Sequence, residues 1–135
     1  MVDAIERNKC IVGHHGRVLK GANLSYYMEH DSILFNQINE REVELDVIGT
    51  GVCGFSTEYF NPTTLCDHKE LRMVDILFSL EAKKQGKKML SLKHNAGWIK
   101  QSDLKGGYSI CASEIKDEER QIKYANKIWQ LKNFR

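Results

Sequence analysis

One carboxylate lies inside an apolar segment of the sequence. Asp75 belongs to MVDILF, residues 73–78, and on a helix it would share a face with Leu71 and Phe78. A carboxylate among apolar side chains is costly unless it is paired or neutral, and one held in such surroundings is suited to general-base chemistry. The structural alternative is that Asp75 caps the start of the helix, or pairs with Arg72 or a lysine.

Three glycines interrupt the most strand-like part of the chain. Gly49, Gly51 and Gly54 all fall within DVIGTGVCGFST, residues 46–57. Glycine weakens a strand, and it often marks a bulge or a point where another group approaches the backbone closely. Gly49, Thr50 and Gly51 therefore form either a floor of exposed backbone for a flat polar ligand such as a sugar, or only a tight turn between two strands.

A histidine and a tryptophan follow another short apolar segment. They are His94 and Trp98 of SLKHNAGWI, residues 91–99. Strand ends in α/β layers are where ligands bind, so His94 could contact a metal or a phosphate, and the indole could stack on a sugar. The alternative for His94 is a polar residue satisfied within the fold. No metal-site spacing relates it to His15 or His68, so the fold would have to assemble any metal site.

The composition excludes several classes of protein. The chain has 135 residues, of which 41% are hydrophobic and 28% charged, as expected for one globular domain. The net charge of +2, with cations and anions interleaved, gives no reason to expect a nucleic-acid partner. No apolar run approaches the ~20 residues that span a bilayer, and the first ten residues do not resemble a signal peptide. The four cysteines lack a C-x-x-C pair and indicate reduced thiols. We therefore expect a cytoplasmic protein without a membrane span.

Short apolar segments of mixed type predict an α/β fold, a partial mixed sheet with flanking helices in a single small domain. We expect a domain over residues 1–112, followed by an amphipathic helix in 113–135. The segment 14–31 shows no clear periodicity and is predicted to be a surface excursion. Strands are expected at 9–13, 43–48, 52–56 and 89–92, and helices at 2–8, 71–82 and 113–132.

Four stretches occur in a characteristic order. They are HGR at 15–17, DVIGTGVCGFST at 46–57, MVDILFSLEAKKQGKKMLSLKH at 73–94 and GWI at 97–99. In order and spacing they resemble the C-terminal, acceptor-side half of a family 2 glycosyltransferase of the GT-A fold, of the bacterial type that builds surface polysaccharides. The resemblance covers about residues 5–100, and it depends on the ordered set rather than on any single motif.

The resemblance implies roles for several residues. In such enzymes the glycine-rich segment, here Gly49–Gly51, lies beside the donor sugar and the acceptor. The helix Asp, here Asp75, is the general base that deprotonates the acceptor hydroxyl during inverting transfer. The histidine after the last strand, here His94, can join a site for Mn or Mg and the diphosphate. The implied partners are a nucleotide-diphosphate sugar and a glycan acceptor.

The chain also departs from the family pattern. Family members begin with a nucleotide-binding half that ends in an Asp-x-Asp metal motif, and no such half is present. Val74 stands where an acidic residue often precedes the catalytic Asp. We therefore expect an acceptor-side portion that is completed by another chain or copy, and self-association through an unpaired sheet edge. The alternatives are a non-catalytic binding or assembly module that retains the fold remnant, and an unrelated small α/β domain in which Asp75 is structural.

Overall fold

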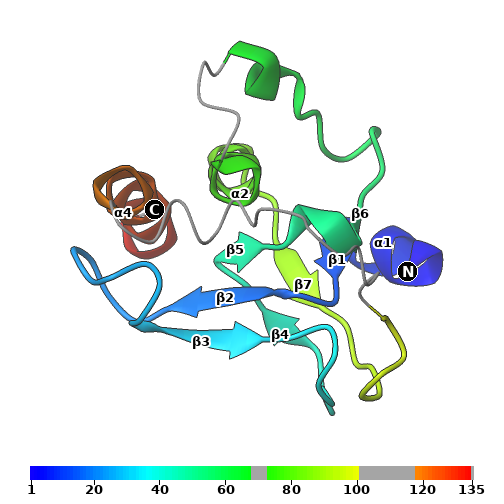
Figure 1. Ribbon diagram of the computed structural model, residues 1–135. Helices are drawn as coiled ribbons and strands as arrows, with labels where there is room; N and C mark the ends of the chain where they lie inside the picture. The colour runs from blue at the N-terminus through cyan, green and yellow to red at the C-terminus, as the bar shows by residue number, and fades with distance from the viewer. Residues whose placement is uncertain (68–72, 101–117, 135) are drawn as a thin grey trace, which may run out of the picture.

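Two small sheets form the framework of the computed structural model, which describes residues 1–67, 73–100 and 118–134 (Figure 1). In the first sheet β1 is parallel to β7 and antiparallel to β6, and β4 is antiparallel to β7. The second sheet is antiparallel throughout. The first sheet has the order β4 (Val43–Glu44), β7 (Met89–Ser91), β1 (Ile11–Gly13) and β6 (Cys53–Gly54), and the second β3 (His30–Ile33), β2 (Gly16–Leu19) and β5 (Val47–Ile48).

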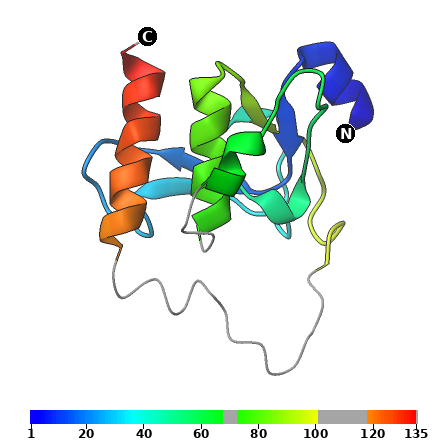
Figure 2. The same cartoon turned by 90° about the horizontal axis from the view of Figure 1, so that it is seen from above.

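In the described part of the chain three α-helices accompany the sheets: α1 (Val2–Asn8), α2 (Val74–Lys84) and α4 (Glu119–Asn133). Helix α2 packs against β5 and lies beside α4, whereas α1 contacts β1 at the other end of the molecule (Figures 1 and 2). The expected α/β class, with a mixed sheet and flanking helices, is confirmed. Within the described residues no helix is long and apolar enough to span a bilayer.

The segment 43–48, expected to be one strand, serves both sheets. Its first half, β4, pairs with β7, and its second half, β5, pairs with β2. At the crossing point the Leu45 amide donates to the Met89 carbonyl at 2.8 Å, and the Asp46 amide donates to the Arg17 carbonyl at 2.9 Å. The prediction of a single strand was wrong because an alternating pattern does not reveal that successive residues pair with different neighbours.

The segment 14–31 is not the irregular surface excursion that its sequence suggested. It contains β2 and the first two residues of β3, and these strands pair antiparallel from Gly16 opposite Ile33 to Leu19 opposite His30. The prediction was wrong because β3 is mostly polar and partly exposed, and ten residues separate the two strands. Neither the apolar alternation nor the short turn that identifies a hairpin is present.

Helix α2 is attached to the second sheet through a buried serine. Ser79 Oγ accepts a hydrogen bond from the Ile48 amide at 3.0 Å and donates one to the Asp75 carbonyl. One turn beyond the sheet contact the helix ends at Lys84, and Gly86 follows with φ of 69°, a left-handed conformation that favours glycine. This termination agrees with the lysines and glycine seen in the sequence.

A buried carboxylate joins α4 to the rest of the fold. Asp46 is 1% exposed, and its Oδ2 accepts hydrogen bonds from the Leu19 amide at 2.9 Å and from Lys132 Nζ at 2.8 Å. Lys83 Nζ of α2 lies 3.6 Å from Oδ1. Ile128 of α4 is also fully buried, in the cluster that contains Leu77. The C-terminal helix therefore belongs to the core rather than to a separate unit.

Candidate functional site

Asp75 lies in the first turn of α2 with its carboxylate directed at the glycine-rich segment. Oδ1 accepts hydrogen bonds from the Thr50 amide at 2.8 Å and from the Thr50 hydroxyl. The side chain is half-buried, and no described residue donates to Oδ2. Asp75 therefore does not cap its own helix. Thr50 thus fixes the orientation of the carboxylate through two hydrogen bonds to Oδ1, while Oδ2 has no hydrogen-bond partner among the described residues, an arrangement that suits a proton acceptor.

The predicted residues Gly49, Thr50 and Gly51 form the approach to this carboxylate. Thr50–Val52 is a single 3₁₀ turn between β5 and β6, so the tight-turn alternative describes the local backbone. Gly51 is exposed, with open space where a side chain would begin. The backbone of Gly51 is thus exposed one residue from Thr50, whose amide donates to Asp75, and the role of this turn as a floor for a sugar stays a prediction.

His15 completes the surroundings of Asp75. Its ring lies directly against Gly49, where an added Cβ would be 2.6 Å from Cδ2. Burial lowers the pKa of His15, and the neighbouring Asp75 carboxylate, which raises it, has a smaller effect. Cys53 Sγ donates to the Thr50 carbonyl at 3.6 Å, and burial and Asp75 together raise the pKa of its thiol. The site thus holds a neutral imidazole and an unreactive thiol beside a single carboxylate.

The two glycines on either side of Thr50 differ in whether there is space for a side chain. Gly49→Ala should lower the free energy of unfolding by about 1–3 kcal/mol, because the new methyl group meets the His15 ring. Gly51→Ala should leave it unchanged or raise it by up to about 1 kcal/mol, because the site is open and the unfolded chain loses freedom. Urea denaturation of both variants measures the difference, and equal stabilities would contradict the contact.

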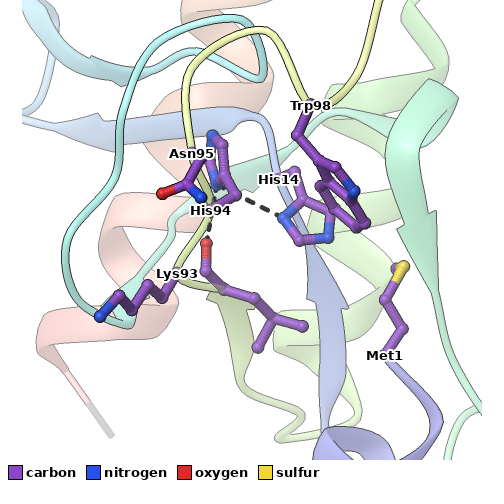
Figure 3. Close-up of a pocket in the computed structure, with 7 residues that line it drawn as sticks. Met1, His14, Lys93, His94, Asn95 and Trp98 are labelled. Atoms are coloured by element: carbon purple, nitrogen blue, oxygen red, sulfur yellow. Dashed lines mark hydrogen bonds between the residues drawn. The ribbon is translucent and has the colours of Figure 1, made fainter.

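A second group of residues surrounds a pocket of about 330 Å³, here called the His14 pocket (Figure 3). It is lined by Met1, His14, Leu92, Lys93, His94, Asn95 and Trp98. The ring of His14 lies edge-on to that of Trp98, with centroids 4.9 Å apart. The predicted residues His94 and Trp98 therefore do meet, but around His14 rather than around Asp75.

His94 does not have the geometry of a metal ligand. It is buried, its Nδ1 lies 2.9 Å from the Leu92 carbonyl oxygen, and its Nε2 lies 3.2 Å from that of Leu34. Both ring nitrogens thus face backbone acceptors. Within residues 1–67, 73–100 and 118–134, no group of three or more His, Cys, Asp or Glu side chains could hold a metal ion. The described residues therefore do not fit the divalent cation that the resemblance implies, and His94 fits the alternative of a histidine satisfied within the fold.

Three histidines make the stability of the fold depend on pH. Burial is the largest cause of a lowered pKa at His14, His15 and His30, whose ordinary value is 6.5. At pH values between the lowered pKa of the folded state and the ordinary pKa, the unfolded chain binds more protons than the folded chain. The free energy of unfolding therefore rises with pH in this window, and stability is lost as the pH falls below about 6.5. The midpoint of urea unfolding should therefore be lower at about pH 5.5 than at about pH 7.5, and equal midpoints would contradict this.

The structure thus separates the predicted site residues into two groups. The glycine-rich turn is joined to Asp75, whereas His94 and Trp98 line the His14 pocket. His14 was not predicted. The available signal was the pair of adjacent histidines after a strand, because successive side chains of a strand point to opposite sides. In the structure His15 faces Gly49 and His14 faces Trp98.

Comparison with known proteins does not assign the chain to a family. No protein-family model matches the chain, and no curated protein matches it. The function must therefore be argued from the two sites themselves.

Proposed function

We propose that the chain is the acceptor-side portion of an inverting, nucleotide-sugar-dependent glycosyltransferase of polysaccharide or glycan synthesis, with Asp75 as the general base. One observation carries this proposal: the Asp75 carboxylate is oriented by two hydrogen bonds from Thr50, and it adjoins the exposed backbone of Gly51. A base for an acceptor hydroxyl needs a fixed carboxylate, an open oxygen and unobstructed access. The resemblance of the same residues to the transferase motifs supports the assignment.

The proposed step uses only the open oxygen of Asp75. An acceptor hydroxyl lies against the turn at Thr50 and Gly51 and gives its proton to Oδ2 as its oxygen attacks the anomeric carbon of the donor sugar. The bond between that carbon and the nucleotide diphosphate breaks, and the nucleotide diphosphate leaves with the bonding electrons. The hydrogen bonds from Thr50 keep the carboxylate aimed at the incoming hydroxyl, which is the usual contribution of a positioned general base.

The donor and its leaving group must be held by something other than the described residues. These residues offer no group of three or more His, Cys, Asp or Glu side chains that could hold a metal ion, so we assign the cation, if it is used, to a nucleotide-binding half supplied from elsewhere. The same observation favours a second candidate, a glycan-binding module that does not catalyse transfer. In both cases we place the protein in the cytoplasm, which the free thiols of Cys10 and Cys53 support.

The proposal can be tested on the chain as it is. In a titration with an oligosaccharide acceptor, followed by nuclear magnetic resonance, the amide signals of Thr50 and Gly51 should shift in the wild type. The shifts should be reduced in Asp75→Ala, which removes the acceptor of the hydroxyl hydrogen bond. Addition of a nucleotide sugar and a nucleotide-binding half should then yield glycosylated acceptor. Transfer by the complete system without any shift at Thr50 or Gly51 would refute the assignment of this surface.

A further inference from the structure

The His14 pocket contains a polar atom that the fold leaves without a partner. His14 is 3% exposed, and its Nε2 has no hydrogen-bond partner among the described residues. The other ring nitrogen, Nδ1, lies 3.4 Å from Nδ1 of His94. Figure 3 shows the ring between His94 and Trp98, with one nitrogen toward His94 and the other on the side of Trp98 and Met1. A buried nitrogen of this kind is costly unless a ligand or water satisfies it.

The hydrogen-bond network indicates what kind of group would satisfy this nitrogen. If Nδ1 of His14 donates to His94, Nε2 carries a lone pair and accepts; if Nδ1 accepts, Nε2 carries the proton and donates. Burial, followed by the nearby His94, lowers the pKa of His14 and favours its neutral form, in which one of these two states applies. A hydroxyl group is both a donor and an acceptor, so it complements Nε2 in either state.

The remaining walls of the pocket fit a sugar ring. The indole of Trp98 is 64% exposed, and a π-face with negative charge density attracts the C–H groups on the flat side of a pyranose. Lys93 and Asn95 are exposed at the rim and supply an ammonium and a side-chain amide for further hydroxyl groups. A volume of 330 Å³ is at the lower end for ligand sites, which corresponds to one or two small units rather than to a long chain.

We propose that the His14 pocket binds a pyranose unit of a saccharide, which stacks on Trp98 and has one hydroxyl hydrogen-bonded to Nε2 of His14. Among the side chains that line the pocket, Lys93 is the one permanent cation, and the ammonium of Met1 also acts on His14, so phosphate is included in the test below. This inference goes beyond the proposed function because it depends on the pocket and not on Asp75. Sugar binding here is therefore a separate property, which catalysis by Asp75 neither requires nor implies.

The test is a titration of the full chain with methyl β-glucopyranoside, methyl β-galactopyranoside and methyl N-acetyl-β-glucosaminide. It follows the indole N–H signals of Trp98 and Trp129 by nuclear magnetic resonance. At least one glycoside should shift Trp98 with a dissociation constant in about the millimolar range, as expected for so small a ligand. Trp129, which packs against the core of α2 and α4, should not shift. Sodium phosphate at the same concentrations should have no effect on Trp98.

Variants separate the contribution of the Trp98 indole from that of Nε2 of His14. Trp98→Ala removes an exposed side chain, so the chain should fold normally and bind the glycoside at least tenfold more weakly, as followed by the amide signal of Asn95. His14→Phe keeps a ring but removes the nitrogen and should weaken binding at least fivefold. Phe134→Ala, which removes an exposed aromatic at the far end of α4, is the matched control and should bind as the wild type does.

Three results would overturn the proposal. They are the absence of a Trp98 shift with all three glycosides at tens of millimolar, a shift with phosphate alone, and unchanged affinity in Trp98→Ala. If His14→Phe unfolds, the Trp98→Ala result alone decides. If the first of these results came with shifts at Thr50 and Gly51, it would support the role of Asp75, so failure here is distinguishable from failure of the proposed function.

Discussion

In a system that includes a nucleotide-binding half, Asp75→Asn is expected to lower the rate of sugar transfer by about 10²–10⁴-fold, the usual contribution of a positioned general base. The amide has the shape of the carboxylate and can still accept the hydrogen bond from the Thr50 amide. It cannot take a proton from the acceptor hydroxyl. Initial rates of product formation at saturating donor and acceptor measure the loss, which should appear in kcat, while KM for the acceptor changes little.

Two controls make this result specific to Asp75. Asp31→Asn changes an exposed carboxylate that pairs with Lys20 on the surface, and transfer should be unaffected. Thr50→Val removes one of the two hydrogen bonds to Oδ1 but keeps the backbone donor, so we expect a smaller loss than with Asp75→Asn. If Asp75→Asn transferred sugar at the wild-type rate, Asp75 would be a structural residue that holds the 50–52 turn.

The sequence pattern was sufficient to predict those helices and strands whose apolar residues follow a regular spacing within one short segment. The helix at α2, the strand at β7 and the amphipathic helix at α4 have apolar residues at regular spacing, and all three are present. The β2–β3 hairpin and the division of residues 43–48 between two sheets were not predicted, because they depend on pairings between distant segments. Such pairings follow from the register of the whole fold and leave little trace in any short window.

The candidate site was predictable only in part, for the same reason. The glycine-rich segment and Asp75 were each predicted to be functional from a separate motif, and the structure joins them through the hydrogen bond from Thr50 to Asp75. The sequence did not indicate that His94 would be enclosed by the Leu92 and Leu34 carbonyl oxygens, nor that Nε2 of His14 would be buried without a partner among the described residues. These properties depend on which strand faces which loop, and residue type alone does not specify that.

Asp46→Ala is expected to cause the largest loss of stability of any single change considered, about 3–5 kcal/mol. The substitution removes the acceptor of the Leu19 amide. Of the two carboxylates that pair with the buried Lys83 ammonium in the described residues, it leaves Glu44, which lies 3.9 Å away and is largely exposed. It also breaks the contact between Lys132 and the core. Because a domain of this size has a total stability of about 5–15 kcal/mol, about a fifth or more of the folding free energy would be lost.

Equilibrium urea denaturation of three variants distinguishes charge from hydrogen bonding at this position. Asp46→Asn keeps an oxygen for the Leu19 amide but not the charge that faces Lys83 and Lys132, so its loss should lie between those of the wild type and Asp46→Ala. Asp31→Ala breaks an exposed pair of similar length and should cost no more than about 1 kcal/mol. If Asp46→Ala cost no more than Asp31→Ala, the apolar face of α4 and its hydrogen bonds to Asn23 would hold the helix, and the buried carboxylate would not be what fixes α4 against β2 and α2.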